Sequence, residues 1–203
     1  MAACEVDAVV FDLGGVLAEF DGLERMRALS GIDDDDDEVW RRWLTCDWVR
    51  RLESGGCSAE DFAAGMVVEW ELNVTADAFL ADFGQWLVGP IPGAEELVRE
   101  TKAAVPTAVL SNTNRVHWEA GAGGWRLLDL FDRTFLSFEL GMVKPDPEIF
   151  THVVDQLAVV PGRVLLLDDN RLNVEQARQV GLRAERAVGV SQAREALVAA
   201  GVV

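Results

Sequence analysis

Residues 9–17, VVFDLGGVL, decide the fold, because an apolar run ends there in a carboxylate and two glycines. The run over residues 6–11 is typical of a parallel strand that is covered on both faces. Two further runs of this kind lie at residues 107–110 and 164–167, and each also ends directly in polar residues. We therefore expect parallel strands whose polar ends meet at one edge of a sheet.

Amphipathic helical patterns separate these runs in the second half of the chain. They span residues 94–104, 148–157, 172–180 and 192–200. Strands that alternate with helices are typical of βαβ units. The sequence thus predicts an α/β fold with a doubly wound, Rossmann-like parallel sheet.

The segment that follows the first strand has a different pattern. Residues 18–88 hold five of the seven tryptophans, show no convincing strand, and contain helical patterns at residues 38–43 and 59–70. Residues 89–93, GPIPG, are typical of a hinge, because proline and glycine do not continue a helix. We therefore expect a core of residues 1–17 and 89–203 and an inserted helical cap of residues 18–88.

Composition argues against several classes of protein. Half of the 203 residues are hydrophobic, enough for a sizeable core, and the formal charge of −17 would repel a nucleic acid. No apolar run approaches the roughly 20 residues of a membrane span, and the first residues lack the positive charge of a signal peptide. Cys4, Cys46 and Cys57 have spacings unlike those of a disulfide framework or zinc site. We expect a cytoplasmic monomer or homodimer that binds neither nucleic acid nor membrane.

Asp12 and Ser111 each follow an expected strand. A carboxylate ahead of two glycines lies where the backbone can approach an anion or a metal closely. A hydroxyl at a strand end, ahead of a helix, can hold phosphate oxygens. Each residue alone has a simpler explanation, because Asp is common in turns and Ser at helix N-caps.

Lys144 stands out because the chain has only two lysines, and the context of the other, Lys102, predicts a surface residue. Lys144 lies within GMVKPDPE, residues 141–148. Pro145 restricts Lys144 to an extended conformation, so a rigid turn presents its side chain. A compact ammonium held in this way is suited to neutralising an anionic ligand.

Asp168 and Asp169 directly follow the apolar run at residues 164–167. Adjacent carboxylates repel each other, and Mg²⁺, a hard cation that prefers oxygen ligands, would compensate for their charge. Capping of the next helix by Asp169 or Asn170 explains one of these residues but not the pair. The sequence therefore indicates a metal site at this strand end.

In this order along the chain, the strand-end residues resemble the four motifs of the haloacid dehalogenase-like superfamily of phosphohydrolases. The matching residues are Asp12 with Gly14, Ser111, Lys144, and Asp168 with Asp169. The inserted segment lies where subfamily IA of this superfamily carries its helical C1 cap. Residues 51–62, 111–115 and 168–173 also resemble the α-D-glucose-1-phosphate phosphatases and the N-terminal phosphatase domain of soluble epoxide hydrolase.

The resemblance implies a role for each matching residue. Asp12 would be the nucleophile that takes up a phosphoryl group, with Ser111 and Lys144 as further catalytic residues. The implied ligands of Mg²⁺ are Asp12, the carbonyl of Gly14, Asp168 and Asp169, and the implied substrate contacts are Ser111, Asn112, Lys144 and Arg115.

The leading prediction is a Mg²⁺-dependent phosphatase that hydrolyses a small phosphorylated metabolite, such as a sugar phosphate, through an aspartyl-phosphate. One departure is Gly14, because most members carry a second Asp there as general acid/base, and its loss typically costs about 10²–10⁴ in rate. Gly14 leaves open a catalytically weakened protein that binds a ligand. A metal-free 2-haloacid dehalogenase is the other alternative, and the Asp168–Asp169 pair argues against it.

Other features indicate structure rather than catalysis. The run of five aspartates at residues 33–37 is expected at a helix N-terminus, and it lacks the alternating ligands and glycine of a calcium loop. His117 and the tryptophans of residues 18–88 are expected to pack.

Overall fold

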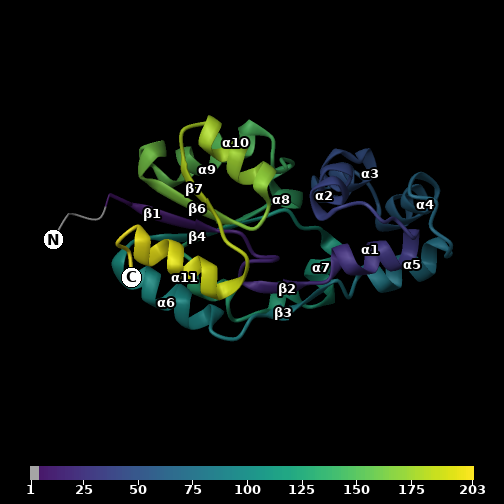
Figure 1. The fold of residues 1–203 in the computed structure, drawn as a ribbon, viewed down its shortest axis with the longest axis horizontal. Coiled ribbons are helices and arrows are strands. Elements are labelled where there is room, and N and C mark those ends of the chain that lie inside the picture. The colour runs from purple at the N-terminus through teal and green to yellow at the C-terminus, as the bar shows by residue number, and fades with distance from the viewer. Residues whose placement is uncertain (1–4) are drawn as a thin grey trace.

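A five-stranded parallel sheet forms the centre of the computed structural model, which describes residues 5–203 (Figure 1). The strands are, in spatial order, β5 (Arg133–Leu136), β4 (Thr107–Ser111), β1 (Ala8–Phe11), β6 (Val164–Asp168) and β7 (Arg183–Arg186). All neighbouring pairs are parallel. The chain adds β4 and β5 on one side of β1 and then crosses to β6 and β7 on the other, so the strand order reverses beside β1. Ligands of α/β sheets bind at such a reversal.

Helices cover both faces of the sheet, α6 (Ala94–Ala104) and α11 (Gly189–Ala199) on one and α9 (Pro147–Leu157) and α10 (Arg171–Gln179) on the other (Figure 1). Val9 and Phe11 belong to the hydrophobic cluster of the first face, and Val10 belongs to that of the second. This alternation follows from the two-residue period of a strand. The predicted doubly wound α/β fold is confirmed.

Shorter helical segments connect the sheet elements. They are α7 (Arg115–Ala120), α8 (Ser137–Leu140) and the 3₁₀ turns η1 (Ala122–Gly124), η2 (Leu128–Leu130) and η3 (Pro161–Arg163). Lys144 lies in the loop between α8 and α9 and belongs to neither helix.

Two short strands lie where the sequence showed none. β2 (Ala18–Phe20) and β3 (Leu87–Pro90) pair in an antiparallel ribbon. The expected boundaries of the inserted segment, residues 18 and 88, lie within these two strands. The pattern missed them because they have only three and four residues, and β3 contains a glycine and a proline, which are depleted in strands.

Five helices lie between β2 and β3 and extend beyond the carboxyl ends of the sheet (Figure 1). They are α1 (Gly22–Ser30), α2 (Asp36–Thr45), α3 (Asp47–Glu53), α4 (Ala59–Glu69) and α5 (Ala76–Phe83). These five helices enclose a hydrophobic cluster of their own, in which Phe62, Phe83 and Trp86 are buried. The two helical patterns found in this segment are confirmed as α2 and α4.

The aspartate run begins α2, as expected. Oδ1 of Asp35 accepts the backbone N–H of Glu38 at 2.9 Å, which satisfies one of the free amides at the helix N-terminus. Cys46 and Cys57 are free thiols, and Cys4 lies outside the described residues. Within the described part of the chain, every helix is too short or too polar to cross a membrane.

Candidate active site

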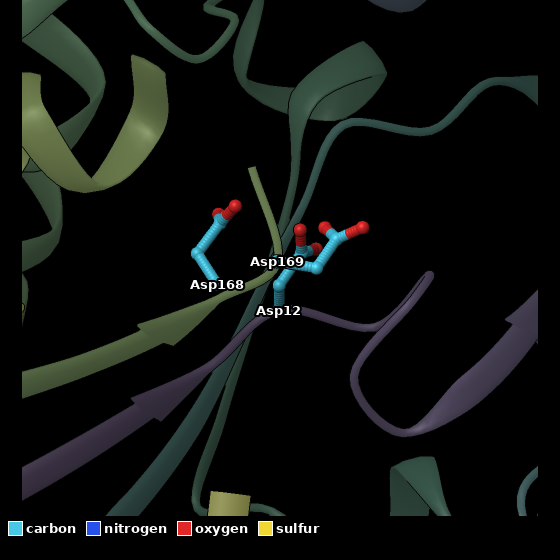
Figure 2. A group of neighbouring side chains, drawn as sticks. All are labelled: Asp12, Asp168 and Asp169. Atoms are coloured by element: carbon cyan, nitrogen blue, oxygen red, sulfur yellow. The ribbon is translucent and has the colours of Figure 1, made fainter. Parts of the chain in front are cut away.

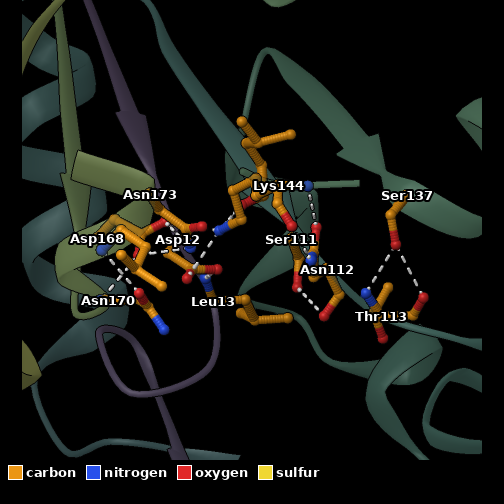
Figure 3. A network of polar contacts seen from close by, with 12 residues as sticks. Asp12, Leu13, Ser111, Asn112, Thr113, Ser137, Lys144, Asp168, Asn170 and Asn173 are labelled. Atoms are coloured by element: carbon orange, nitrogen blue, oxygen red, sulfur yellow. Dashed lines mark hydrogen bonds and ion pairs between the residues drawn. The ribbon is translucent and has the colours of Figure 1, made fainter. Parts of the chain in front are cut away.

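The polar ends of β1, β4 and β6 meet at one edge of the sheet (Figure 3). Asp12 directly follows β1, Ser111 ends β4, and Asp168 ends β6. All three side chains are buried, although charged and hydroxyl groups are seldom buried without partners. Their partners define the site.

The ammonium of Lys144 lies between two of these carboxylates. Nζ is 2.8 Å from Oδ2 of Asp12 and 2.7 Å from Oδ2 of Asp168, and it also donates to the carbonyl of Leu110 at 3.1 Å. Burial alone would lower the pKa of Lys144, but the two carboxylates outweigh burial and raise its pKa above the ordinary value. Lys144 therefore carries its charge, and its three N–H groups are all engaged.

Asn112 fixes the main chain of Lys144. Oδ1 of Asn112 accepts the backbone N–H of Lys144 at 2.8 Å, and Nδ2 donates to the Lys144 carbonyl at 2.9 Å (Figure 3). The side chain that follows Ser111 thus ties β4 to the loop that presents the ammonium. Its second N–H donates to Oε2 of Glu53 at 3.1 Å.

Asp12, Asp168 and Asp169 form an acidic cluster at the ends of β1 and β6, with ligand-type oxygens within 4.8 Å of one another (Figure 2). Burial raises the pKa of Asp12 well above its ordinary value, and the charge of Lys144 opposes this. Burial, together with the neighbouring Asp168, raises the pKa of Asp169 to about 7. Three carboxyl groups thus crowd around one ammonium.

Asp168 is held by donors on both of its oxygens. Oδ1 accepts the backbone N–H of Asn170 at 2.9 Å and Nδ2 of Asn173 at 3.0 Å. Oδ2 accepts Nδ2 of Asn173 at 3.1 Å and Nζ of Lys144 at 2.7 Å. A carboxylate has about four sites for acceptance, so these bonds occupy Asp168 fully.

Two glycines after Asp12 have different physical roles. Gly15 has a φ of +73°, and a Cβ there would lie 2.3 Å from Oδ2 of Asp169, so the backbone approaches this carboxylate as only a glycine can. At Gly14 a Cβ would meet Phe20 at 3.7 Å, which is an ordinary contact. The loop therefore needs a glycine at position 15 but not at position 14.

The site opens into a small pocket with a cavity volume of about 70 Å³. Asp12, Ser111 and Lys144 line its core side. Helices α2 and α3 contribute Trp40, Trp43, Leu44 and Glu53, and the ribbon contributes Phe20 and Leu87. The cavity is thus polar toward the sheet and largely apolar toward these helices. Most predicted residues line it, namely Asp12, Gly14, Ser111, Asn112, Lys144 and Asp169, whereas Asp168 contacts Lys144 without lining the cavity.

Arg115 is not among the residues that line this pocket, and its expected contact with the substrate stays a prediction. It is exposed as the first residue of α7, and its guanidinium lies 5.4 Å from the ring centroid of Phe138. The side chain of Asn114 caps α7 at this point, so Arg115 starts the helix on the solvent side.

His117 has a structural role, as expected. Its Nε2 lies 2.8 Å from the carbonyl of Phe83 in α5, and its Nδ1 lies 3.2 Å from Nδ2 of Asn114. Because Oδ1 of Asn114 accepts the backbone N–H of His117, Nδ2 faces the ring, and this assigns the proton to Nε2. Burial lowers the pKa of His117 to about 4, so the ring is neutral.

Sequence reasoning missed Glu53, a buried carboxyl group in the pocket wall. Burial raises the pKa of Glu53 to about 7, and donation from Trp43 and Asn112 and the charges of Lys144 and Arg50 oppose this rise. The only signal was its place in residues 51–62, because no periodic pattern shows that the last residue of α3 faces the core. The tryptophans of residues 18–88 were expected mainly to pack, with one able to line the cleft, and Trp40 and Trp43 line the pocket.

Comparison with known proteins identifies the family. The family model for haloacid dehalogenase-like hydrolases matches residues 6–181, and the chain belongs to this family. A D-ribitol-5-phosphate phosphatase from Bacteroides thetaiotaomicron is 29% identical over 85% of this chain and 87% of its own length. Similarity to rat bifunctional epoxide hydrolase 2 is local, with 40% identity over 26% of this chain and 9% of that protein. An L-2-haloacid dehalogenase from Xanthobacter autotrophicus superposes with a TM-score of 0.62 at 26% identity, over 98% of this chain and 84% of that structure.

Proposed function

We propose that the protein is a phosphatase that hydrolyses a small phosphorylated metabolite through a phosphorylated Asp12. The observation that carries this proposal is the placement of Asp12 and Lys144, with their 2.8 Å ion pair, in the wall of one open pocket. The family and the ribitol phosphate phosphatase relative support the same class of reaction.

The contacts of Asp12 suit a nucleophile. Oδ1 accepts the backbone N–H of Leu13 at 2.7 Å and Oδ2 pairs with Lys144, so the carboxylate is oriented before a substrate binds. An oxygen of Asp12 forms a bond to phosphorus while the ester bond breaks. Water then attacks phosphorus, and phosphate and the free carboxylate are restored.

Ser111 and Lys144 would hold the phosphoryl group. Ser111 lies at the end of β4 in the pocket wall, where its hydroxyl and nearby backbone amides can donate to phosphoryl oxygens. The fixed ammonium of Lys144 offsets the negative charge that gathers on these oxygens. Charge stabilisation and positioning are the main sources of catalysis in phosphoryl transfer.

The donor set fits Mg²⁺. Asp12 and Asp169 offer carboxylate oxygens, and the carbonyl of Gly14 is a third hard donor. When bound, Mg²⁺ neutralises charge on the phosphoryl oxygens. Because Asp168 is occupied by four donated hydrogen bonds, we assign it to holding Lys144 and Asn173 and to reaching the metal only through water. Oδ1 of Asn173 is buried and has no partner among the described residues, so it can accept from such a water.

The substrate would be a small polar phosphate ester, and a sugar or sugar-alcohol phosphate is our candidate. The relative that acts on D-ribitol 5-phosphate supports this class. We assign residues 18–88 to a cap that covers the phosphate site and selects the group attached to phosphorus. Cytoplasmic location and a monomeric or homodimeric state stay predictions.

A panel of phosphorylated metabolites tests the proposal. We expect Mg²⁺-dependent release of inorganic phosphate by the wild type and none by Asp12→Asn. Turnover that survives complete chelation, with halide release from 2-haloacids, would instead indicate the dehalogenase. Failure to hydrolyse any ester in the presence of Mg²⁺ would favour the ligand-binding alternative.

A further inference from the structure

Hydrolysis of an alkyl phosphate needs a proton for the departing oxygen, because an alkoxide is a poor leaving group. Among the described residues, the titratable side chains that line the pocket are Asp12, Glu53, His117, Lys144 and Asp169. Asp12 and Asp169 are already assigned to nucleophilic attack and to the metal. Among these side chains, the proton donor can therefore only be Glu53, His117 or Lys144.

Lys144 and His117 are unsuited to giving a proton. The N–H groups of Lys144 are engaged by Asp12, Asp168 and the Leu110 carbonyl, and these carboxylates hold its proton tightly. The neutral ring of His117 has one N–H, which donates to the carbonyl of Phe83. Glu53 remains.

The contacts of Glu53 fix the side chain without taking its proton. Nδ2 of Asn112 donates to Oε2 of Glu53 at 3.1 Å. Oδ1 of Asn112 is turned to the backbone N–H of Lys144, and Trp43 also donates to Glu53, so both neighbours present donors to this carboxyl group. A proton on the carboxyl group of Glu53 is therefore left for a group inside the pocket.

The position of Glu53 ties it to the reacting groups. Its partner Asn112 follows Ser111 directly and clamps the main chain of Lys144, so one short network joins Glu53 to the phosphate site. Glu53 is 8% exposed and the rest of the cap-side wall is largely aromatic or aliphatic. The pKa of about 7 that burial gives Glu53 agrees with a group that both gives and takes a proton near neutrality.

We propose that Glu53, at the end of α3 in the cap, is the general acid/base of the reaction. This inference rests on the proposed phosphatase function. It assigns the proton transfer to the cap rather than to position 14 of the core, where this chain has a glycine.

Glu53 alone gives the proton in the first step and takes one back in the second. As the Asp12 oxygen bonds to phosphorus, the ester P–O bond breaks, and its electron pair takes the proton of the Glu53 carboxyl group, so the product leaves as an alcohol. The Glu53 carboxylate then takes a proton from water as the water oxygen bonds to phosphorus. The bond from phosphorus to Asp12 breaks, and phosphate leaves with both carboxyl groups restored.

Substituted phenyl phosphates provide the test, because their shape is constant while the leaving group varies in basicity. For the wild type we expect kcat/KM to depend weakly on the leaving group. Glu53→Gln keeps the volume and can keep an acceptor for Asn112, but it cannot transfer a proton. We expect its kcat/KM, which reports cleavage of the ester bond, to be near wild type for p-nitrophenyl phosphate and to fall by about 10²–10⁴ for the most basic leaving groups. Its kcat should also fall on good leaving groups, because the attacking water loses its base.

Glu60→Gln, the same change on the exposed face of α4, is the matched control and should keep the wild-type dependence. An equal loss of kcat/KM on every substrate, or no change in its dependence on the leaving group, would overturn the role of Glu53 as the acid while leaving Asp12 chemistry intact. A steep dependence in the wild type itself would overturn it independently of any variant. Absence of wild-type hydrolysis would instead overturn the phosphatase function.

Discussion

The two lysines of this chain have opposite environments, although their chemistry is the same. Lys144 is buried between Asp12 and Asp168, whereas Lys102 is 39% exposed in its side chain and pairs with Asp132 at 2.9 Å. A buried charge that loses its partner destabilises a fold far more than a surface pair does. Replacing each lysine in turn therefore tests whether the ammonium of Lys144 stabilises the buried carboxylates of the site.

We predict that Lys144→Met lowers the free energy of unfolding by about 3–5 kcal/mol and abolishes phosphate release, because two buried carboxylates lose their cation. Lys102→Met should lower it by less than about 1 kcal/mol and keep phosphate release. Urea denaturation followed by circular dichroism measures both. Similar losses for the two variants would show that Lys144 is not held as described.

Residue-level prediction succeeded where an unusual residue type stood in a rigid context. Lys144 was identified by its rarity and by Pro145, and the structure places it in the site. Arg115 starts α7 away from the pocket lining, because the sequence does not show which way the first residue of a helix points, and its substrate contact stays a prediction. Glu53 was missed because its burial depends on how the cap helices pack against the core.

His117 gives the protein an acid-sensitive contact between α7 and α5. Its pKa of about 4 in the folded state lies below the ordinary 6.5, so the unfolded chain binds more protons between these values. The stability contributed by the neutral ring is therefore complete above pH 6.5 and is lost as the pH falls through about 4. The full effect is about 3 kcal/mol.

We predict that His117→Asn flattens the fall in unfolding free energy between pH 6.5 and 4, because the titrating ring is gone. His152→Asn, which changes the other histidine of the sequence, is the control. Urea denaturation at half-unit pH steps supplies the data. An unchanged slope in His117→Asn would mean that the ring is not buried as a neutral group.

At the scale of elements, the loop between β1 and β2 depends on one glycine. We predict that Gly15→Ala lowers the free energy of unfolding by about 1–3 kcal/mol, because a methyl group would combine a positive φ with a clash against Asp169. Gly14→Ala is the matched variant for stability, since its Cβ meets only ordinary contacts, and it should stay near wild type. Equal melting temperatures for the two variants would contradict this geometry.

Elements with a continuous pattern were predicted well, and edge elements were not. β1, β4 and β6 are buried along their whole length, so they appear in the sequence as unbroken apolar runs. β5 and β7 lie at the two edges of the sheet and carry exposed charged residues such as Arg133 and Glu185, which hide the strand signal. The ribbon of β2 and β3 was too short to leave any pattern.

At the scale of the whole molecule, helices α1–α5 meet the rest of the chain through few polar contacts. Arg50 of α3 pairs with Asp146 at 2.6 Å, and Asp37 of α2 pairs with Arg171 at 2.9 Å. Two hydrogen bonds join Asn112 to Glu53 and His117 to the Phe83 carbonyl. Both hydrogen bonds lie beside the phosphate pocket. The sequence predicted a core, an inserted helical segment and one sheet edge at which the polar residues meet. It could not predict the contacts between the segment and the core, because these residues are far apart in the chain and meet only in the assembled fold.

The charge of the whole chain also acts on its stability. With 35 acidic and 18 basic residues, the protein repels itself, and salt screens this repulsion. We predict that the melting temperature rises between about 10 mM and 150 mM NaCl, as the screening length falls from about 30 to 8 Å. Differential scanning calorimetry measures this, and a constant or falling melting temperature would show that the surface ion pairs outweigh the net repulsion.

The central claim, that Asp12 takes up the phosphoryl group, is tested most directly by mass spectrometry of acid-quenched enzyme during turnover with Mg²⁺ and a hydrolysed phosphate ester. The account predicts a mass increase of one phosphoryl group on the peptide that contains Asp12, and its absence in Asp12→Asn. A phosphoryl group on another residue, or rapid turnover by Asp12→Asn, would contradict it.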